Sequence, residues 1–204
     1  MVKNDEIDDI SLIGGSLCFH FVNTVHDYKA NEIADYMFNG LDLIAWAKKV
    51  EIINSEEANR LEVVLLEDQK AGEKFFLKGI KLRNLLYRMF AAVSREERIM
   101  EKELKLFNEY LEEYFKLLKL TFRDGQYAES YDLPADNLMR IIAPVVRDTY
   151  DVLLFQKLKR IRECPNCGWL FLDTSKNGKR RWCSMQSCGS NVKALEWYHR
   201  HKGD

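Results

Sequence analysis

The chain has 204 residues, of which 47% are apolar and 31% are charged. This length allows one main hydrophobic core with a small appendage, and the composition excludes an intrinsically disordered chain. No apolar run approaches the ~20 residues of a membrane-spanning helix, and the acidic N-terminus lacks the apolar stretch of a signal peptide. We therefore expect a cytoplasmic protein without a membrane partner.

Charge is distributed unevenly along the sequence. From Gln156 to the C-terminus there are six Lys and five Arg against two Glu and two Asp, a net charge of +7. The whole chain carries −1, so residues 1–155 carry −8. An acidic first part followed by a basic second part indicates an anionic partner for the second part.

Residues 1–155 are predicted to form a mainly α, multihelical body. Ser16 is expected to cap a short helix that follows the Gly14-Gly15 turn. Apolar residues predict a second short helix around 41–46, and Ser55 is expected to be the N-cap of a third.

Longer amphipathic helices are predicted over residues 76–93 and 100–118, where apolar residues recur at helical spacing. Between them, Ser94 and Glu97 have the spacing of a capping box for the second helix. Core packing is the simplest explanation of these apolar stripes.

A small β-hairpin is predicted next, because apolar residues alternate on both sides of Asp124-Gly125. A last long helix follows Pro134, and we expect Pro144 to kink or restart it. This helix runs toward the basic part without a flexible linker, so we expect the two parts to pack together.

Four of the five cysteines lie close together in the basic part, spaced Cys-x2-Cys, fifteen residues, Cys-x4-Cys. Cysteine pairs at short spacing in a reducing compartment are typical of metal ligands. Four thiolates close a tetrahedral shell, so the pattern predicts a structural rather than a catalytic zinc site. A redox Cys-x-x-Cys is the main alternative, but it would need only the first pair. The predicted ligands are Cys164, Cys167, Cys183 and Cys188.

The residues between the ligands predict a treble-clef-like finger over 156–204. Gly168 allows the positive φ of a knuckle turn, and residues 170–172 have strand character. Asn177-Gly178 predicts a hairpin turn, with Arg181-Trp182 as the returning strand. Cys188 is then expected in the first turn of a C-terminal helix.

Motifs at both ends of the chain resemble the CGNR zinc-finger family, whose members carry an N-terminal ABATE domain. The C-terminal motif comprises the four cysteines with Leu170-Phe171, Asp173, Ser175, Arg180-Arg181-Trp182, Ser184-Met185 and Gly189. The N-terminal motif comprises Gly14-Gly15, Leu17-Cys18 and Phe21-Val22-Asn23-Thr24. Ser190-Asn191 stands where the family has Asn-Arg, so its arginine is missing. The resemblance implies a bacterial transcription regulator with an ABATE-like domain over 1–155.

Nucleic acid, with DNA favoured, is one predicted partner of the finger. Cations near the predicted turn and helix can reach phosphates, and tryptophans can support them or stack on bases. The alternative is that these charges only solvate a small structural finger. The candidate contact residues are Lys176, Lys179, Arg180, Arg181, Lys193 and Arg200.

A ligand-sensing or protein-docking role with a purely structural zinc is the second hypothesis. A small-molecule effector could meet the backbone amides of Gly14 and Gly15 and the side chains of Asn23 and Thr24, although capping and packing also explain these residues. We expect no enzyme, because the sequence has no phosphate-binding glycine motif, nucleophile elbow or helical metal-protease motif. The sequence leaves a homo-oligomer open.

Overall fold

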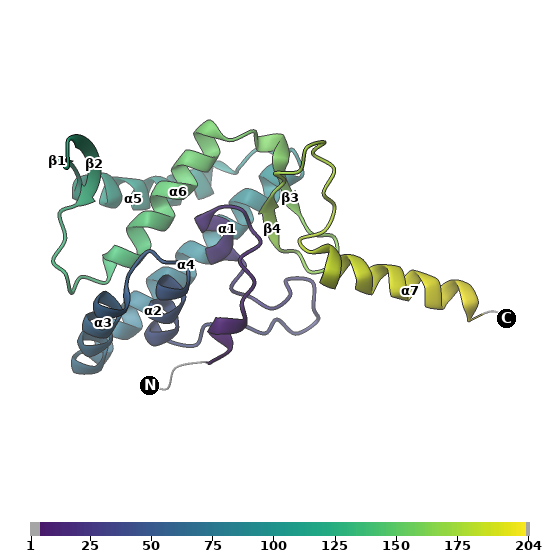
Figure 1. The fold of residues 1–204 in the computed structure, drawn as a ribbon, viewed down its shortest axis with the longest axis horizontal. Coiled ribbons are helices and arrows are strands. Elements are labelled where there is room, and N and C mark those ends of the chain that lie inside the picture. Colours follow the sequence, from purple (N-terminus) through teal and green to yellow (C-terminus); the bar gives the residue numbers. More distant parts are fainter. Residues whose placement is uncertain (1–4, 203–204) are drawn as a thin grey trace.

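A computed structural model describes residues 5–202, so the outermost ends of the predicted 1–155 and 156–204 units lie outside the described part. Seven α-helices and two short hairpins occur in this range (Figure 1). The helices are α1 (Leu17–Val22), α2 (Gly40–Lys49), α3 (Ser55–Glu67), α4 (Gln69–Ser94), α5 (Glu101–Leu117), α6 (Met139–Phe155) and α7 (Ser190–His201). The strands are β1 (Leu118–Arg123), β2 (Gln126–Tyr131), β3 (Ile161–Glu163) and β4 (Leu170–Leu172).

Helix α1 lies at the centre of the molecule, in contact with α4, α6 and β4. Its residues Cys18, Phe19, Phe21 and Val22 are fully buried, so this six-residue helix is apolar on almost every side. Such a helix is stable only inside a core. The core that surrounds it is continuous from α2 to α6 and includes Ile161 and Leu170 of the β3–β4 hairpin.

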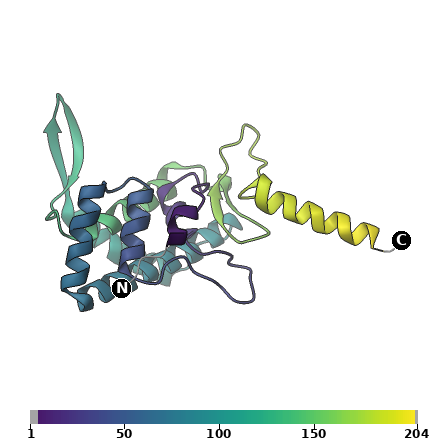
Figure 2. The same ribbon diagram turned by 60° about the horizontal axis from the view of Figure 1, so that its bottom comes forward.

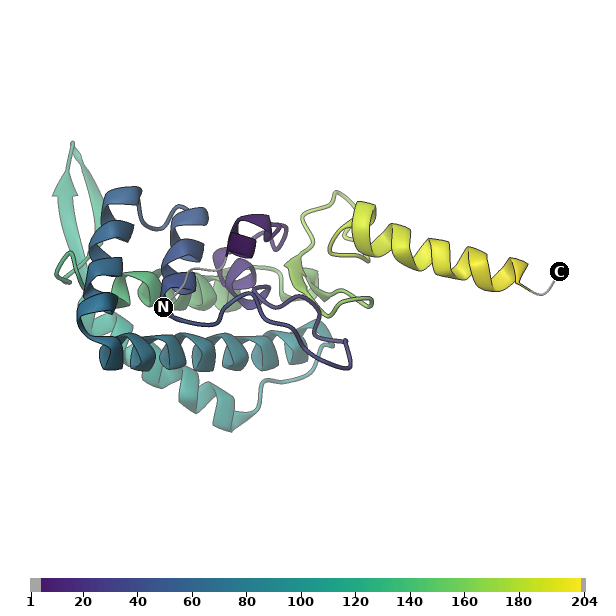
Figure 3. The same ribbon diagram turned by 90° about the horizontal axis from the view of Figure 1, so that it is seen from below.

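The long helix α4 supports the body along one side (Figure 3). It has 26 residues, and its buried stripe agrees with the apolar spacing that predicts it. The predicted helix at 100–118 corresponds to α5, but the capping box expected at Ser94 and Glu97 is wrong. Ser94 is the last residue of α4, and its hydroxyl donates to the Ala91 carbonyl at 2.8 Å. The N-cap of α5 is Met100, so α5 begins at Glu101 rather than directly after Ser94.

The start of α3 also differs from the prediction. Its N-cap is Asn54, whose side chain accepts a hydrogen bond from the Glu57 amide at 2.9 Å. The Glu57 carboxylate in turn accepts from the Asn54 amide at 2.9 Å. The reciprocal pair is a full capping box, whereas Ser55 would have placed Ala58 at the position where the box needs Glu.

The β1–β2 hairpin confirms the prediction made at Asp124-Gly125. The strands are antiparallel, with Leu118 opposite Tyr131 and Arg123 opposite Gln126. Asp124 and Gly125 have φ values of 51° and 82°, which a tight two-residue turn requires. The hairpin projects from the end of the body away from the C-terminus (Figure 2).

The last helix of the body, α6, runs without interruption through Pro144, so the helix does not restart there. It ends at Phe155, and a 3-10 turn, Leu158–Arg160, leads directly into β3. The structure thus confirms a mainly α fold with a small hairpin and a C-terminal cysteine cluster. Between residues 5 and 202, no helix combines the length and apolarity needed to cross a membrane.

Candidate metal centre

The first two cysteines lie in the turn of the β3–β4 hairpin. β3 and β4 are antiparallel, with Ile161 opposite Leu172 and Glu163 opposite Leu170. The Gly168 amide donates to the Cys164 carbonyl at 2.9 Å, and Gly168 has a φ of 74°. This is the knuckle turn that the sequence predicts.

The predicted returning strand at Arg181-Trp182 is wrong. β4 pairs with β3, which precedes the first cysteine, and residues 179–183 form no strand. Instead, Asp173 shapes the loop: its carboxylate accepts from the Ser175 amide at 2.9 Å and the Arg180 amide at 3.0 Å. Burial opposes ionisation of Asp173, yet the hydrogen bonds from Ser175 and Arg180 lower the pKa of its carboxyl.

The four predicted ligands converge on one point. Their Sγ atoms all lie within 4.8 Å of one another, and all four residues are buried. The Cys183 sulfur is 3.5 Å from that of Cys167 and 3.5 Å from that of Cys188. Tetrahedral coordination with metal–sulfur bonds of about 2.3 Å requires sulfur separations of about 3.8 Å, so the cluster needs only small adjustments to hold a metal ion.

The cysteine side chains of the cluster shift the pKa values of one another. Hydrogen bonds from Cys167 and Cys183 hold the pKa of the Cys164 thiol far below its ordinary value. Hydrogen bonding to Cys164 raises the pKa of both Cys167 and Cys183. A divalent ion would supply the charge that lets all four sulfurs bind it as thiolates.

The cluster belongs to a small second core that the body helps to close. The cysteines pack with Trp169 and Phe171, and the body residues Ile13, Tyr28 and Tyr36 cover them. The Tyr28 amide donates to the Cys167 carbonyl at 2.9 Å, and the Trp169 indole donates to the Val25 carbonyl at 2.7 Å. Trp169 is only 7% exposed, so it serves this contact and is unavailable for stacking on a base.

We call the contact between residues 13–28 and β4 with its knuckle the seam, and the predicted effector-binding residues lie in it. The Asn23 side chain donates to the Leu170 carbonyl at 2.8 Å and accepts from the Leu170 amide at 2.9 Å. The Thr24 hydroxyl donates to the Phe21 carbonyl at 2.8 Å and accepts from buried Arg83 at 3.1 Å. The polar groups of Asn23 and Thr24 are thus used inside the protein.

Gly14 and Gly15 have a similar role in the seam. The Gly14 carbonyl accepts from the Leu172 amide at 2.8 Å, and Gly15 has a φ of 80°. At the start of α1, the Asp148 carboxylate accepts from the Ser16 hydroxyl at 2.6 Å and the Cys18 amide at 2.7 Å. An internal carboxylate therefore occupies the place where the sequence suggests an anionic effector.

Gly168 gives a test of how tightly the seam is packed. A Cβ atom at this position would lie 2.8 Å from the Tyr28 Cβ. We expect Gly168→Ala to lower the free energy of unfolding by about 2–4 kcal/mol, through the positive φ and the clash together. Denaturant unfolding of the metal-loaded protein measures the loss.

The matched control is Gly125→Ala, because Gly125 has a φ of 82° but a Cβ there would meet nothing within 4 Å. The Gly125→Ala variant therefore measures the destabilisation from the positive φ alone. Equal losses for the two variants would mean that the seam yields to the extra methyl group.

Some of the predicted nucleic-acid contacts are exposed to solvent, whereas one is held by hydrogen bonds within the protein. Lys176, Lys179 and Arg181 are exposed on the finger loop. The Arg180 side chain instead donates hydrogen bonds to backbone carbonyls. Its guanidinium donates to the Trp182 carbonyl at 3.0 Å, to the Cys183 carbonyl and to the Ile13 carbonyl at 3.3 Å. It also lies 4.4 Å from the centre of the Phe171 ring. We infer that Arg180 positions the loop.

Helix α7 carries the other two predicted contacts, Lys193 and Arg200, and both are exposed. The helix follows the π-helical turn Met185–Gly189, which contains Cys188, and extends away from the body (Figures 1 and 3). Lys193 shares a surface groove of about 430 Å³ with Lys179 and Arg181, and half-buried Trp182 lines it. We call this the finger groove.

A second hollow lies between the body and the finger, and we call it the junction cleft. It has a volume of about 630 Å³. Lys29 and Arg95 of the body and Arg162 of β3 line it. The sequence did not predict these three cations as site residues, because they come from distant segments and no local motif links them. Lys179, Arg180 and Arg181 complete its basic lining, so the two hollows share these three residues.

Comparison with known proteins supports the finger. Residues 160–201 match the family described as the CGNR zinc finger. The matched segment contains the four clustered cysteines, the loop shaped by Asp173 and helix α7. No curated protein matches the chain.

Proposed function

We propose that the chain is a zinc-dependent nucleic-acid-binding protein that contacts phosphates through the finger groove, with a role in transcription regulation and duplex DNA as the favoured partner. The observation that carries the proposal is the gathering of Lys179, Arg181 and Lys193 in one groove beside the cysteine cluster. From Thr174 to Lys202, seven Lys and Arg residues accompany one carboxylate, that of Glu196. Neutralised phosphates and released counterions drive binding to such a surface.

Zinc is the metal that the donor set favours. Four thiolates that can surround one ion tetrahedrally bind zinc in preference to hard cations, which prefer oxygen ligands. They also leave no coordination position open for a reacting water. The ion would hold the loop and α7 in fixed positions, so that cations separated in the sequence act together. We therefore propose a structural zinc and a binding protein rather than an enzyme.

The cations of the finger groove are available for phosphate. In the part of the chain that the structure describes, neither Lys179 nor Lys193 pairs with a carboxylate. The Arg181 guanidinium lies 4.6 Å from the centre of the Trp182 ring, which orients it without neutralising it. Arg200 lies further along α7, where its Nε donates to the Glu196 carbonyl at 3.2 Å.

Salt dependence of binding tests the proposal. We expect Lys179→Ala with Arg181→Ala to weaken binding and to reduce the slope of log K against log salt by about 1.8, because each duplex phosphate contact contributes about 0.9. Asn191→Arg, which restores the family arginine on exposed α7, should steepen the slope by about 0.9. Fluorescence anisotropy with random duplex and single-stranded DNA measures both.

Lys102→Ala with Lys105→Ala is the control, because both lysines are exposed on α5 away from the finger. This variant should match the wild-type slope. If the family arginine acts as a clamp, Asn191→Arg will change the melting temperature and leave the slope unchanged. Equal slopes for the Lys179/Arg181 variant and the wild type would refute binding through the groove.

Protein docking is a second candidate function, and exposed apolar side chains on α7 support it. Its side chains Leu195, Trp197 and Tyr198 are exposed by 56%, 59% and 50%. Exposed apolar side chains gathered on one element mark binding surfaces, and a protein partner would cover them. The anisotropy experiment separates the candidates, because a docking module with a structural zinc would bind neither duplex nor single strand at low salt.

A further inference from the structure

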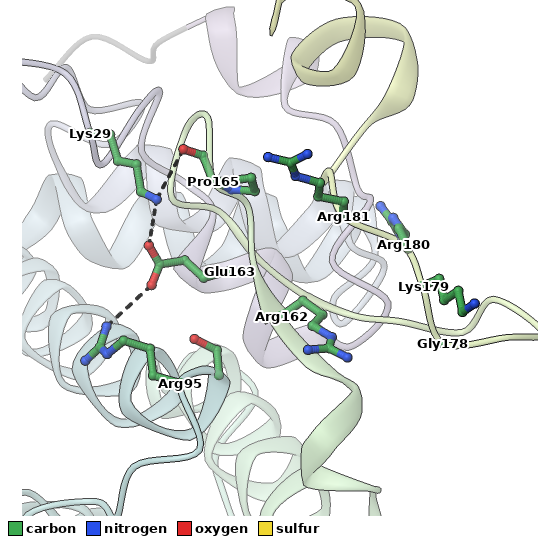
Figure 4. A pocket seen from close by; sticks show the side chains of 10 residues that line it. Lys29, Arg95, Arg162, Glu163, Pro165, Gly178, Lys179, Arg180 and Arg181 are labelled. Carbon is green, nitrogen blue, oxygen red and sulfur yellow. Dashed lines mark hydrogen bonds and ion pairs between the residues drawn. The ribbon is translucent and has the colours of Figure 1, made fainter. Parts of the chain in front are cut away.

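The junction cleft is strongly cationic for its size. Six Lys and Arg side chains line it against the single carboxylate of Glu163, an excess of five positive charges. Figure 4 shows that the lining comes from three places: the body, β3 and the finger loop. Like charges that line one cleft repel one another, and a bound anion would relieve this repulsion.

Glu163 neutralises only one side of the cleft. Its carboxylate is 3.1 Å from the Lys29 ammonium and 3.5 Å from the Arg95 guanidinium (Figure 4). Arg95 also contacts Glu97 at 3.1 Å. Among residues 5–202, by contrast, neither Arg162 nor Lys179 pairs with a carboxylate. The unbalanced charge therefore lies on the β3 and loop side.

We propose that the junction cleft binds a small molecule that carries at least two adjacent phosphate groups, such as a nucleoside diphosphate. Its volume of about 630 Å³ lies within the range of small-molecule sites, ~300–1,000 Å³. Arginine recognises phosphate through paired N–H donors, and Arg162, Arg181 and Lys179 all line the cleft. A single phosphate would leave most of this charge unbalanced.

The ligand would also affect the finger groove, and this part rests on the proposed function. Lys179 and Arg181 line both hollows, so a phosphate held in the cleft competes with nucleic acid for the same two cations. The small molecule would then weaken nucleic-acid binding. By linkage, nucleic acid would weaken binding of the small molecule by the same factor.

Calorimetric titration of the zinc-loaded full chain tests the site directly. Inorganic pyrophosphate and ADP are the diphosphate probes, and inorganic phosphate and AMP are the single-phosphate probes. We expect the diphosphates to bind at one site per chain, at least about tenfold more tightly than the single phosphates, because charge-assisted hydrogen bonds are lost with each missing group.

Charge variants locate the site. Arg162→Gln and Lys179→Gln should each weaken pyrophosphate binding by about tenfold or more, whereas Glu163→Gln should tighten it by removing the internal carboxylate. Lys179 is in an exposed loop, so its variant remains informative if Arg162→Gln disturbs the knuckle. Lys105→Gln, on α5, should leave pyrophosphate affinity unchanged.

The absence of measurable heat with pyrophosphate at low salt would overturn the proposal, as would equal affinity in all these variants. These titrations contain no nucleic acid, so their failure is distinct from failure of the proposed function. Pyrophosphate added to a preformed complex with labelled duplex should lower its anisotropy in the wild type but not in Lys179→Gln. Anisotropy that is unaffected in the wild type would overturn the competition between the two hollows.

Discussion

Replacement of Cys183 by serine is expected to remove the bound metal and to unfold the finger. The second core contains six buried residues, four of which are the cysteines themselves, so little apolar area remains once the ion is lost. Metal analysis of protein prepared without chelators should give one zinc ion per wild-type chain and almost none in the variant. Limited proteolysis should cut the loop between β4 and α7 in the variant only.

Cys18→Ala is the matched control, because Cys18 is also fully buried but lies outside the cluster. It should lower the melting temperature and keep the full metal content. Wild-type protein without metal would refute the zinc proposal, whatever the behaviour of the variants.

Chelation of the metal from the wild-type protein tests the proposed division at residue 155. We expect α1–α6 to keep their helical circular dichroism after chelation, since the main core is built mostly from their own apolar faces. Loss of most of the signal would show that the finger and the body unfold as one cooperative unit.

Asn23→Ala is expected to cause the second large effect. Asn23 is 1% exposed, and both of its hydrogen bonds go to the backbone of Leu170. Truncation leaves a buried amide and a buried carbonyl without partners, at about 1–3 kcal/mol each. We expect the free energy of unfolding to fall by about 2–5 kcal/mol in urea titrations.

Asn31→Ala is the control for this variant, because Asn31 is exposed on the loop after Tyr28. It should change stability by less than about 0.5 kcal/mol. A small effect at Asn23 would mean that water replaces its side chain at β4, and the seam would then be looser than the structure indicates.

Local patterns predicted the features that depend on neighbouring residues. The hairpin at Asp124-Gly125 and the knuckle turn from Cys164 to Cys167 are tight turns whose geometry depends on a few adjacent residues. The sequence therefore predicted both turns. The amphipathic stripes predicted α5 with its ends to within one residue, and α4 with its end but not its start, which lies at Gln69 rather than residue 76. Ser94 was misassigned because its hydroxyl bonds back to its own helix, which sequence spacing does not distinguish from a cap.

Features that join distant segments were not predictable in this way. Asn23 and Thr24 suggested a ligand pocket, because the sequence does not show the distant groups that bind their side chains. Their partners, Leu170 and Arg83, are 147 and 59 residues away. Its charge alone does not distinguish Arg180 from Arg181, but the hydrogen bond from the Arg180 guanidinium to the Ile13 carbonyl gives Arg180 a different role.

The seam has a consequence for synthesis of the protein. Asn23 leaves the ribosome early, but Leu170 is made 147 residues later. Until then α4 and α6 can cover α1, but the side of α1 that contacts β4 stays uncovered. Contacts of such long sequence separation slow folding, and the uncovered surface favours aggregation. The helices of the body can therefore form first, but the seam closes only when the last part of the chain has been made.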